Sequence, residues 1–139
     1  MGKSEYKVII SGGPRPLHPV CSTELSRLGR EAIYNAFRHA HARTIEVELV
    51  YQDGSLNLRI RDNGIGIDEQ VLHDGGRAGH LGMVGIKERS NKLGAKLSIW
   101  SQRGSGTEIE VSVAASVAYV MPERKTLRGW FLKWVQRSS

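Results

Sequence analysis

A strand that ends in a carboxylate and two glycines constrains the fold of this 139-residue chain more than any other stretch. Residues 56–62 alternate between apolar and polar side chains, as a strand with one buried face does. Asp62 continues the apolar row, so its carboxylate is predicted to point inward, where a charge without a partner is costly. Gly64 and Gly66 follow and allow a partner to approach the backbone closely. The stretch predicts the wall of a binding pocket.

The remaining alternation predicts a sheet with one polar and one apolar face. Asp53-Gly54 is typical of a hairpin turn, and Thr107 lies in phase with an apolar row, as Asp62 does. The first strand is expected at an edge of the sheet. The other predicted strands are Tyr6–Ile10, Thr44–Tyr51, Lys96–Ser101 and Thr107–Val113, and the polar face is predicted to carry Glu46, Glu48, Arg59, Arg61, Glu108 and Glu110.

Two helices are predicted to cover the apolar face. The first is expected from Ser22 as N-cap to about Ala42, with Glu24 in its first turn, where the helix dipole favours an acid. The second is expected over 83–93 and ends at Gly94, a good C-cap residue. Residues 68–73 could form one short helical turn. The predicted fold is an α/β (α+β) two-layer sandwich, with a mixed, largely antiparallel sheet and helices on one face.

Four stretches in order carry a family resemblance that covers about residues 20–114. They are 30–40 (REAIYNAFRHA), 62–66 (DNGIG), 79–89 (GHLGMVGIKER) and 104–107 (GSGT). Their order and spacing resemble the N box and the three glycine boxes of the histidine-kinase-like ATPases (HATPase_c, GHKL), which have the Bergerat ATP-binding fold. The first box, with Glu31, Asn35 and the following His39, looks most like the sensor histidine kinases of the NarX/DesK type.

The resemblance implies that Asp62 reads adenine. A carboxylate can accept a hydrogen bond from the exocyclic amine of adenine, whereas guanine presents an acceptor at that place. In the family a threonine helps, here Thr107, and the pocket wall would include Gly64, Gly66 and Ile67. The alternative is that Asp62 only caps its own turn and Thr107 is an ordinary strand residue.

The first helix is implied to face magnesium and phosphate. Mg²⁺ prefers oxygen ligands, and the family uses the asparagine that corresponds to Asn35. Glu31, one turn earlier, is a candidate catalytic residue that would hold a metal-bound water or act as a base. Arg38 and His39 could contact phosphate, although His39 could equally be packed.

A glycine-rich stretch before the second helix is implied to bind the phosphates. Free N–H groups and the helix dipole at a helix start bind anions. The residues implied are Gly79, His80, Leu81, Gly82, Met83, Val84 and Gly85, and residues 74–81 would form the ATP lid. Lys87 could add a contact or lie on a solvated helix face.

The resemblance implies an enzyme, the ATP- and Mg²⁺-binding catalytic domain of a sensor histidine kinase. The expected organisation is an N-terminal edge strand and connector (1–21), the catalytic domain (22–116) and a basic, aromatic-containing tail (117–139). The five histidines lack the pattern of a phosphoacceptor helix pair, so the dimerisation domain would be a partner and the isolated chain inactive in autophosphorylation. A response regulator would act downstream. Alternatives of the same fold are a stand-alone anti-sigma-factor-type serine kinase and a non-catalytic nucleotide-binding module.

Charge and composition limit other functions. Residues 123–139 hold five Lys or Arg and one acid, which gives +4 of the net +6, so the basic character is poor support for nucleic-acid binding by the remainder. The same tail contains Trp130, Phe131 and Trp134 and could contact a membrane surface or a partner as an amphipathic helix, or pack on the domain itself. No signal peptide or membrane span is expected. The single Cys21 and the resemblance favour a cytoplasmic location, as the cytoplasmic domain of a membrane-bound kinase.

Overall fold

The computed structural model describes residues 5–38, 40–66, 83–120 and 135–136. Its strands are β1 (Glu5–Ser11), β2 (Thr44–Tyr51), β3 (Ser55–Asp62), β4 (Lys96–Gln102) and β5 (Gly106–Ala114). The helices are α1 (Pro19–Arg38), α3 (Met83–Lys92) and α4 (Ala115–Ala118). Every predicted strand is present, and α4, a single turn, is an addition that the sequence did not predict.

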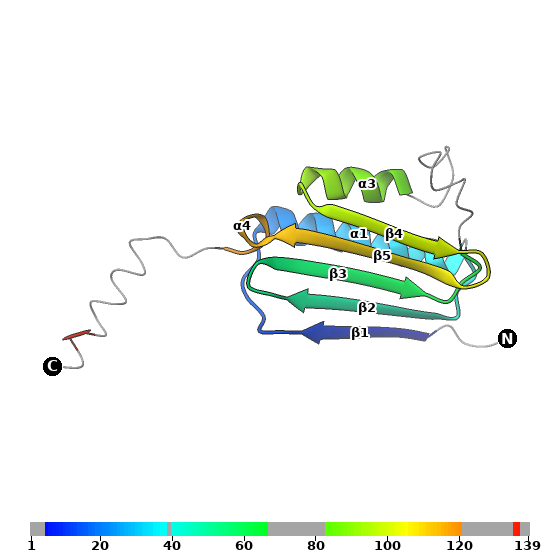
Figure 1. Cartoon of the computed structure of the whole chain (residues 1–139), viewed down its shortest axis with the longest axis horizontal. Helices are drawn as coiled ribbons and strands as arrows, with labels where there is room; N and C mark the ends of the chain where they lie inside the picture. Colours follow the sequence, from blue (N-terminus) through cyan, green and yellow to red (C-terminus); the bar gives the residue numbers. More distant parts are fainter. Residues whose placement is uncertain (1–4, 39, 67–82, 121–134, 137–139) are drawn as a thin grey trace.

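The strands form one five-stranded sheet in the order β1-β2-β3-β5-β4 (Figure 1). β1 pairs with β2 in parallel, and the other three pairings are antiparallel. A parallel pair needs a long crossover, which α1 provides between β1 and β2. The Asp53-Gly54 turn joins β2 and β3 as a hairpin, as predicted, and β1 lies at an edge.

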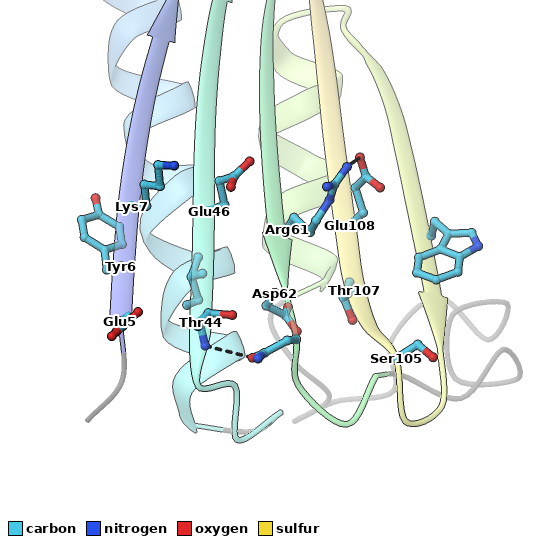
Figure 2. Close-up of a pocket in the computed structure, with 13 residues that line it drawn as sticks. Glu5, Tyr6, Lys7, Thr44, Glu46, Arg61, Asp62, Ser105, Thr107 and Glu108 are labelled. Carbon is cyan, nitrogen blue, oxygen red and sulfur yellow. Dashed lines mark hydrogen bonds and ion pairs between the residues drawn. The ribbon is translucent and has the colours of Figure 1, made fainter. Parts of the chain in front are cut away.

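Helices α1 and α3 cover one face of the sheet and enclose the core. The fully buried side chains include Leu28 from α1, Ile86 from α3, and Leu56, Val111 and Val113 from the central strands. Both helices lie behind the sheet when it is viewed from its other face (Figure 2). This arrangement confirms the two-layer sandwich.

The uncovered face is held by an ion-pair ladder across three strands. The Arg59 guanidinium lies 3.8 Å from Glu48, 3.1 Å from Glu108 and 3.7 Å from Glu110, and Arg61 lies 3.4 Å from Glu108. These side chains come from β2, β3 and β5 and were predicted to share the polar face. Each pair is partly exposed and adds little to the free energy of unfolding. We infer that the pairs mainly favour the observed register of the β2, β3 and β5 strands.

The first helix begins earlier than the sequence predicted. It starts at Pro19, so the expected N-cap at Ser22 and the expected first-turn position of Glu24 are wrong. Proline suits the first helical position, because its missing N–H would have no partner there and its φ is already helical. The Ser22 amide is inside the helix and donates to the His18 carbonyl at 3.0 Å.

The two large helices end differently with respect to the prediction. The α1 bounds stop at Arg38 rather than Ala42, and the amides of Ala40 and Ala42 donate to carbonyls of the last helical turns. Helix α3 is followed by Gly94, with φ +58°, so the predicted C-cap is confirmed.

Candidate nucleotide site

Asp62 and Thr107 are neighbours at the end of the central strands. They are cross-strand partners in the β3–β5 ladder, and Ser101 continues the same row on β4. The Asp62 carboxylate accepts a hydrogen bond from the Gly64 amide at 2.8 Å, so it does cap its own turn. It also accepts one from the Thr107 amide. Burial raises the pKa of Asp62 above its usual value near 3.8, and the two amide contacts oppose this shift.

Asp62 points toward the helices rather than the open face. Its neighbour in sequence, Arg61, lies on the open face, and adjacent side chains of a strand point to opposite faces. A side chain at Gly64 would meet both the Ala40 carbonyl at 2.5 Å and the Asp62 carboxylate at 3.0 Å. The end of α1 therefore meets the loop after β3 at the Asp62 carboxylate.

The loop after β3 forms hydrogen bonds with the segment after α1 and with the turn between β4 and β5. The Ile65 amide donates to the Ala40 carbonyl at 2.8 Å, and the Ile65 carbonyl accepts from the Gly104 amide at 2.7 Å. The Asn63 side-chain oxygen accepts from the amides of Arg43 and Thr44, both at 2.9 Å. The loop thus joins the ends of α1, β2 and the β4–β5 turn. No local pattern indicated the role of Asn63, because its two donors lie about 20 residues earlier in the chain.

Thr107 is buried, and its hydroxyl lies 2.9 Å from the Ser101 hydroxyl. Ser101 in turn donates to the Gly106 carbonyl at 3.1 Å. Sequence reasoning missed Ser101, although its phase in the strand before the GSGT turn could have indicated it.

The candidate residues of α1 take three different positions. Asn35 is buried, with 8% of its surface exposed. Arg38 is exposed and its guanidinium lies 5.8 Å from the centre of the Tyr34 ring, at the outer surface of the helix. Glu31 faces α3, where its Oε1 accepts hydrogen bonds from Arg89 Nε at 3.1 Å and Nη2 at 2.9 Å.

The start of α3 packs against Glu31. Met83 is buried in the core, Val84 is exposed, and Gly85 lies against the Glu31 carboxylate, where a side chain would collide with Oε2. Among the described residues, Glu31 Oε2 is buried and has no hydrogen-bond partner. The predicted contacts Ile67, Gly79, His80, Leu81, Gly82 and His39, together with the predicted helical turn and lid, lie outside the described residues.

Asn35, with Glu31 one helical turn earlier, is the candidate magnesium ligand. Within the described ranges, no three His, Cys, Asp or Glu side chains gather as a metal cluster. The oxygen chemistry nevertheless fits Mg²⁺, because Glu31 Oε2 lacks a partner there and Asn35 lies one helical turn further along.

A hollow of about 410 Å³ lies at the same end of the sheet but opens on the face away from the helices. Figure 2 shows Lys7, Glu46, Arg61 and Glu108 in front of the strands, with both helices behind. Asp62 and Thr107 line it from their strands, yet their side-chain row belongs to the helix face. The hollow therefore shares Asp62 and Thr107 with the predicted nucleotide contacts, although it opens on the face opposite to the one that their side chains enter.

Comparisons with known proteins identify the family. Residues 21–116 match the family described as histidine kinase-, DNA gyrase B- and HSP90-like ATPase. The nitrate/nitrite sensor protein NarQ of Escherichia coli is 39% identical over 89 residues, which are 63% of this chain and 15% of NarQ. The sensor histidine kinase LiaS of Bacillus subtilis is 35% identical over 101 residues, 73% of this chain and 26% of LiaS. The chain thus spans about a quarter or less of these relatives.

Solved structures show the same fold. The blue-light activated histidine kinase of Erythrobacter litoralis superposes with a TM-score of 0.67 at 23% identity, over 81% of this chain and 36% of that one. The histidine kinase AdeS of Acinetobacter baumannii gives a TM-score of 0.65 at 18% identity, over 81% and 55%. The fold, the Asp62–Thr107 pair and the family match lead to one conclusion: the chain belongs to the histidine kinase-, DNA gyrase B- and HSP90-like ATPases, and its relatives are sensor histidine kinases of the NarX and NarQ type.

Proposed function

We propose that this chain is the ATP-binding catalytic domain of a sensor histidine kinase and donates the γ-phosphoryl group of ATP to a histidine on a separate dimerisation domain. The observation that carries the proposal is the Asp62–Thr107 pair. It combines a partly buried carboxylate with a buried hydroxyl at adjacent strand ends, on the face that α1 and α3 cover. Burial there raises the pKa of Asp62 despite its two amide contacts, and this strained charge supports the binding of a polar ligand.

Each described residue has a role in this proposal. Asp62 accepts the adenine amine, and Thr107, with Ser101 beside it, supports the same edge of the base. The first turn of α3, including Met83, Val84 and Gly85, offers backbone N–H groups to the phosphates. Asn35 would hold Mg²⁺, which would neutralise charge on the phosphates as the group is transferred, and Glu31 would hold a metal-bound water or act as a base. Arg38 would have to leave Tyr34 to reach a phosphate.

The partners and the location follow from the same proposal. The dimerisation domain supplies the histidine, a response regulator accepts the phosphoryl group next, and the domain works on the cytoplasmic side of a membrane-bound parent. We propose no nucleic-acid partner.

Nucleotide binding is tested by ATP titration of the wild-type chain and of Asp62→Asn, with and without Mg²⁺. Asp62→Asn replaces one acceptor oxygen by a donor, so we expect an affinity loss of about 10- to 100-fold, as for a lost charge-assisted hydrogen bond. Asp53→Asn, in the exposed turn between β2 and β3, is the matched control and should bind normally. Equal affinity of wild type and Asp62→Asn would refute the assignment of the adenine contact.

Phosphoryl transfer is tested with a separately produced dimerisation domain of a NarX-type kinase and γ-labelled ATP. We expect acid-labile, base-stable label on its histidine. Acid-stable phosphoserine on a partner would favour the serine-kinase alternative, and ATP binding without transfer to any partner would favour the non-catalytic module.

A further inference from the structure

One arginine joins the two helices that flank the candidate site. Arg89 of α3 contacts two carboxylates of α1, with Nη1 3.2 Å from Glu24 Oε2 and Nη2 2.9 Å from Glu31 Oε1. The two acids are seven residues apart in α1 and therefore lie on one face, two turns from each other. A single guanidinium thus spans two turns of the neighbouring helix.

Glu24 is the fixed side of this contact. It is 7% exposed and lies 4.0 Å from Arg27, so it is nearly enclosed and its charge meets two cations. The Arg89 side chain is 23% exposed, and the two carboxylates raise the pKa of its guanidinium above the usual value, Glu31 more than Glu24. Arg89 is consequently held at Glu24 and remains charged.

Glu31 is the adjustable side. Arg89 Nε and Nη2 both donate to Oε1, which leaves Oε2 free of Arg89. That second oxygen is buried against Gly85, in the first turn of α3, and has no partner among the described residues. A buried acceptor without a donor is unfavourable, so something must fix the carboxylate in this orientation.

We propose that Arg89 is the positioning residue for Glu31: anchored on Glu24, its planar fork binds Oε1 and thereby holds Oε2 at the start of α3, ready for a metal-bound water or another donor of the nucleotide complex. This inference rests on the proposed function, because it assigns a task to the phosphate end of the same site. Lysine cannot reproduce three contacts in one plane, so the role requires arginine.

The alternative is that Arg89 only holds α1 and α3 together, and it leads to a different expected result. If Arg89 only joined the helices, its removal would lower stability and ATP affinity together, whatever residue stood at 31. If it acts through Glu31, its removal matters only while Glu31 is present. A double-mutant cycle between the two positions separates these cases.

The experiment measures three quantities for the full chain: the phosphoryl-transfer rate at saturating ATP with a separate phosphoacceptor domain, the dissociation constant of ATP, and urea unfolding. We expect Arg89→Met to lower the transfer rate about 10- to 100-fold, as loss of a partner that orients a ligand does, with an ATP affinity change of about threefold or less. In the Glu31→Gln background, Arg89→Met should change the rate by about twofold or less.

Two further variants keep the result interpretable. Arg89→Lys retains the charge and most of the side chain, so it should fold if Arg89→Met does not, yet recover the rate only partly. Lys92→Met removes an exposed cation from the same helix and should leave the rate unchanged.

The outcomes distinguish the two proposals. A wild-type chain that neither binds ATP nor transfers phosphate overturns the proposed function and this inference with it. A wild-type chain that transfers phosphate, with Arg89→Met and Arg89→Lys as fast as wild type or equally impaired with and without Glu31, overturns the inference alone.

Discussion

At the scale of single residues, folding and nucleotide binding favour opposite protonation states of Asp62. Its burial disfavours the charged form and raises its pKa, whereas an adenine amine needs the charged oxygen as acceptor. The amides of Gly64 and Thr107 reduce the conflict without removing it, because they donate to the same carboxylate and the pKa still lies above its usual value. Folding and nucleotide binding should therefore respond to acid in opposite directions.

The effect of pH on the contribution of Asp62 to the free energy of unfolding has a definite sign. Because the pKa of Asp62 is higher in the folded chain than in the unfolded one, the folded chain binds more protons between the two values. The contribution of Asp62 to the free energy of unfolding is therefore fully present below about pH 4, the usual aspartate range, and is lost as the pH rises through the folded pKa. Above that pKa the charged, buried carboxylate remains a cost.

The first prediction compares this dependence with ATP binding. As the pH falls from neutral toward the usual aspartate range, ATP affinity should fall because Asp62 takes up its proton, while the stability of the nucleotide-free chain gains from the same protonation. Titrations of ATP and urea unfolding at each pH, with wild type and Asp62→Asn, measure both trends. The difference between the two proteins isolates the Asp62 contribution, and a difference that does not vary with pH would contradict the prediction.

Single residues also show where sequence reasoning ends. Alternation predicted the inward direction of Asp62 and Thr107, because strand phase is a local property. The partners of Arg89 and Asn63 could not be predicted in the same way, since Glu24 and Glu31 lie about 60 positions from Arg89 and the donors to Asn63 about 20 from it. Such contacts depend on how α1, α3 and β2 pack, and hydrophobic periodicity carries no information on these pairs.

At the scale of elements, the turn between β4 and β5 supports the base of the site. Gly104 and Gly106 both have positive φ, +83° and +97°. A side chain at Gly104 would meet no atom within 4 Å, whereas one at Gly106 would collide with the Asp62 carbonyl. The two glycines share the backbone requirement and differ only in this contact.

The second prediction uses this pair. Gly104→Ala should lower the free energy of unfolding by about 1 kcal/mol, through the left-handed conformation alone. Gly106→Ala should cost at least about 2 kcal/mol more, because β5 must also move away from the end of β3. Urea unfolding measures both, and ATP titration should show the larger affinity loss for Gly106→Ala. Equal costs for the two variants would mean that the strand ends can separate freely.

Predicted elements agreed with the structure where periodicity decides and at the Gly94 C-cap, and differed at the two ends of α1. The five strands and both large helices were predicted from alternation and from three- and four-residue spacing. The start of α1 was misplaced because Pro19 fell within the predicted connector (1–21), although proline is favoured at a first helical position. The single turn α4 is too short to leave a periodic pattern.

At the scale of the whole molecule, the first residues of the predicted tail (117–139) pack into the folded body, because Ala118 and Tyr119 are completely buried. Tyr119 is completely buried, its ring stacks on Tyr51 with centres 6.2 Å apart, and its hydroxyl lies 2.9 Å and 2.8 Å from the carbonyls of Gln52 and Ser55. The next residue, Val120, donates its amide to the Pro16 carbonyl. Tyr119 thus fastens the chain after β5 to the turn between β2 and β3.

The distribution of charge separates the two parts. Residues 123–139 carry +4 of the net +6, so the remainder is nearly neutral. Of these residues the structure describes only Val135 and Gln136, and the amphipathic-helix prediction lies mostly outside the described part of the chain. No helix among the described residues is both long and apolar enough to cross a membrane. A surface contact through the tail is the membrane interaction that the sequence supports.

The last prediction concerns this contact. Each Lys or Arg near an anionic bilayer contributes about 1 kcal/mol at low salt, and tail aromatics such as Trp130 and Trp134 can enter the headgroup region. We expect the chain to sediment with phosphatidylserine-containing vesicles at low salt and to be released at about 1 M salt, where screening acts within about 3 Å. It should not bind neutral vesicles, because the aromatic residues alone are too few to hold it.

Lys125→Glu with Arg128→Glu should abolish binding, whereas Lys92→Glu with Lys96→Glu, an equal charge change on the exposed surface of the folded body, should not. Loss of binding in both double variants would assign the attraction to net charge rather than to the tail, and absence of binding by the wild-type chain would exclude the membrane contact.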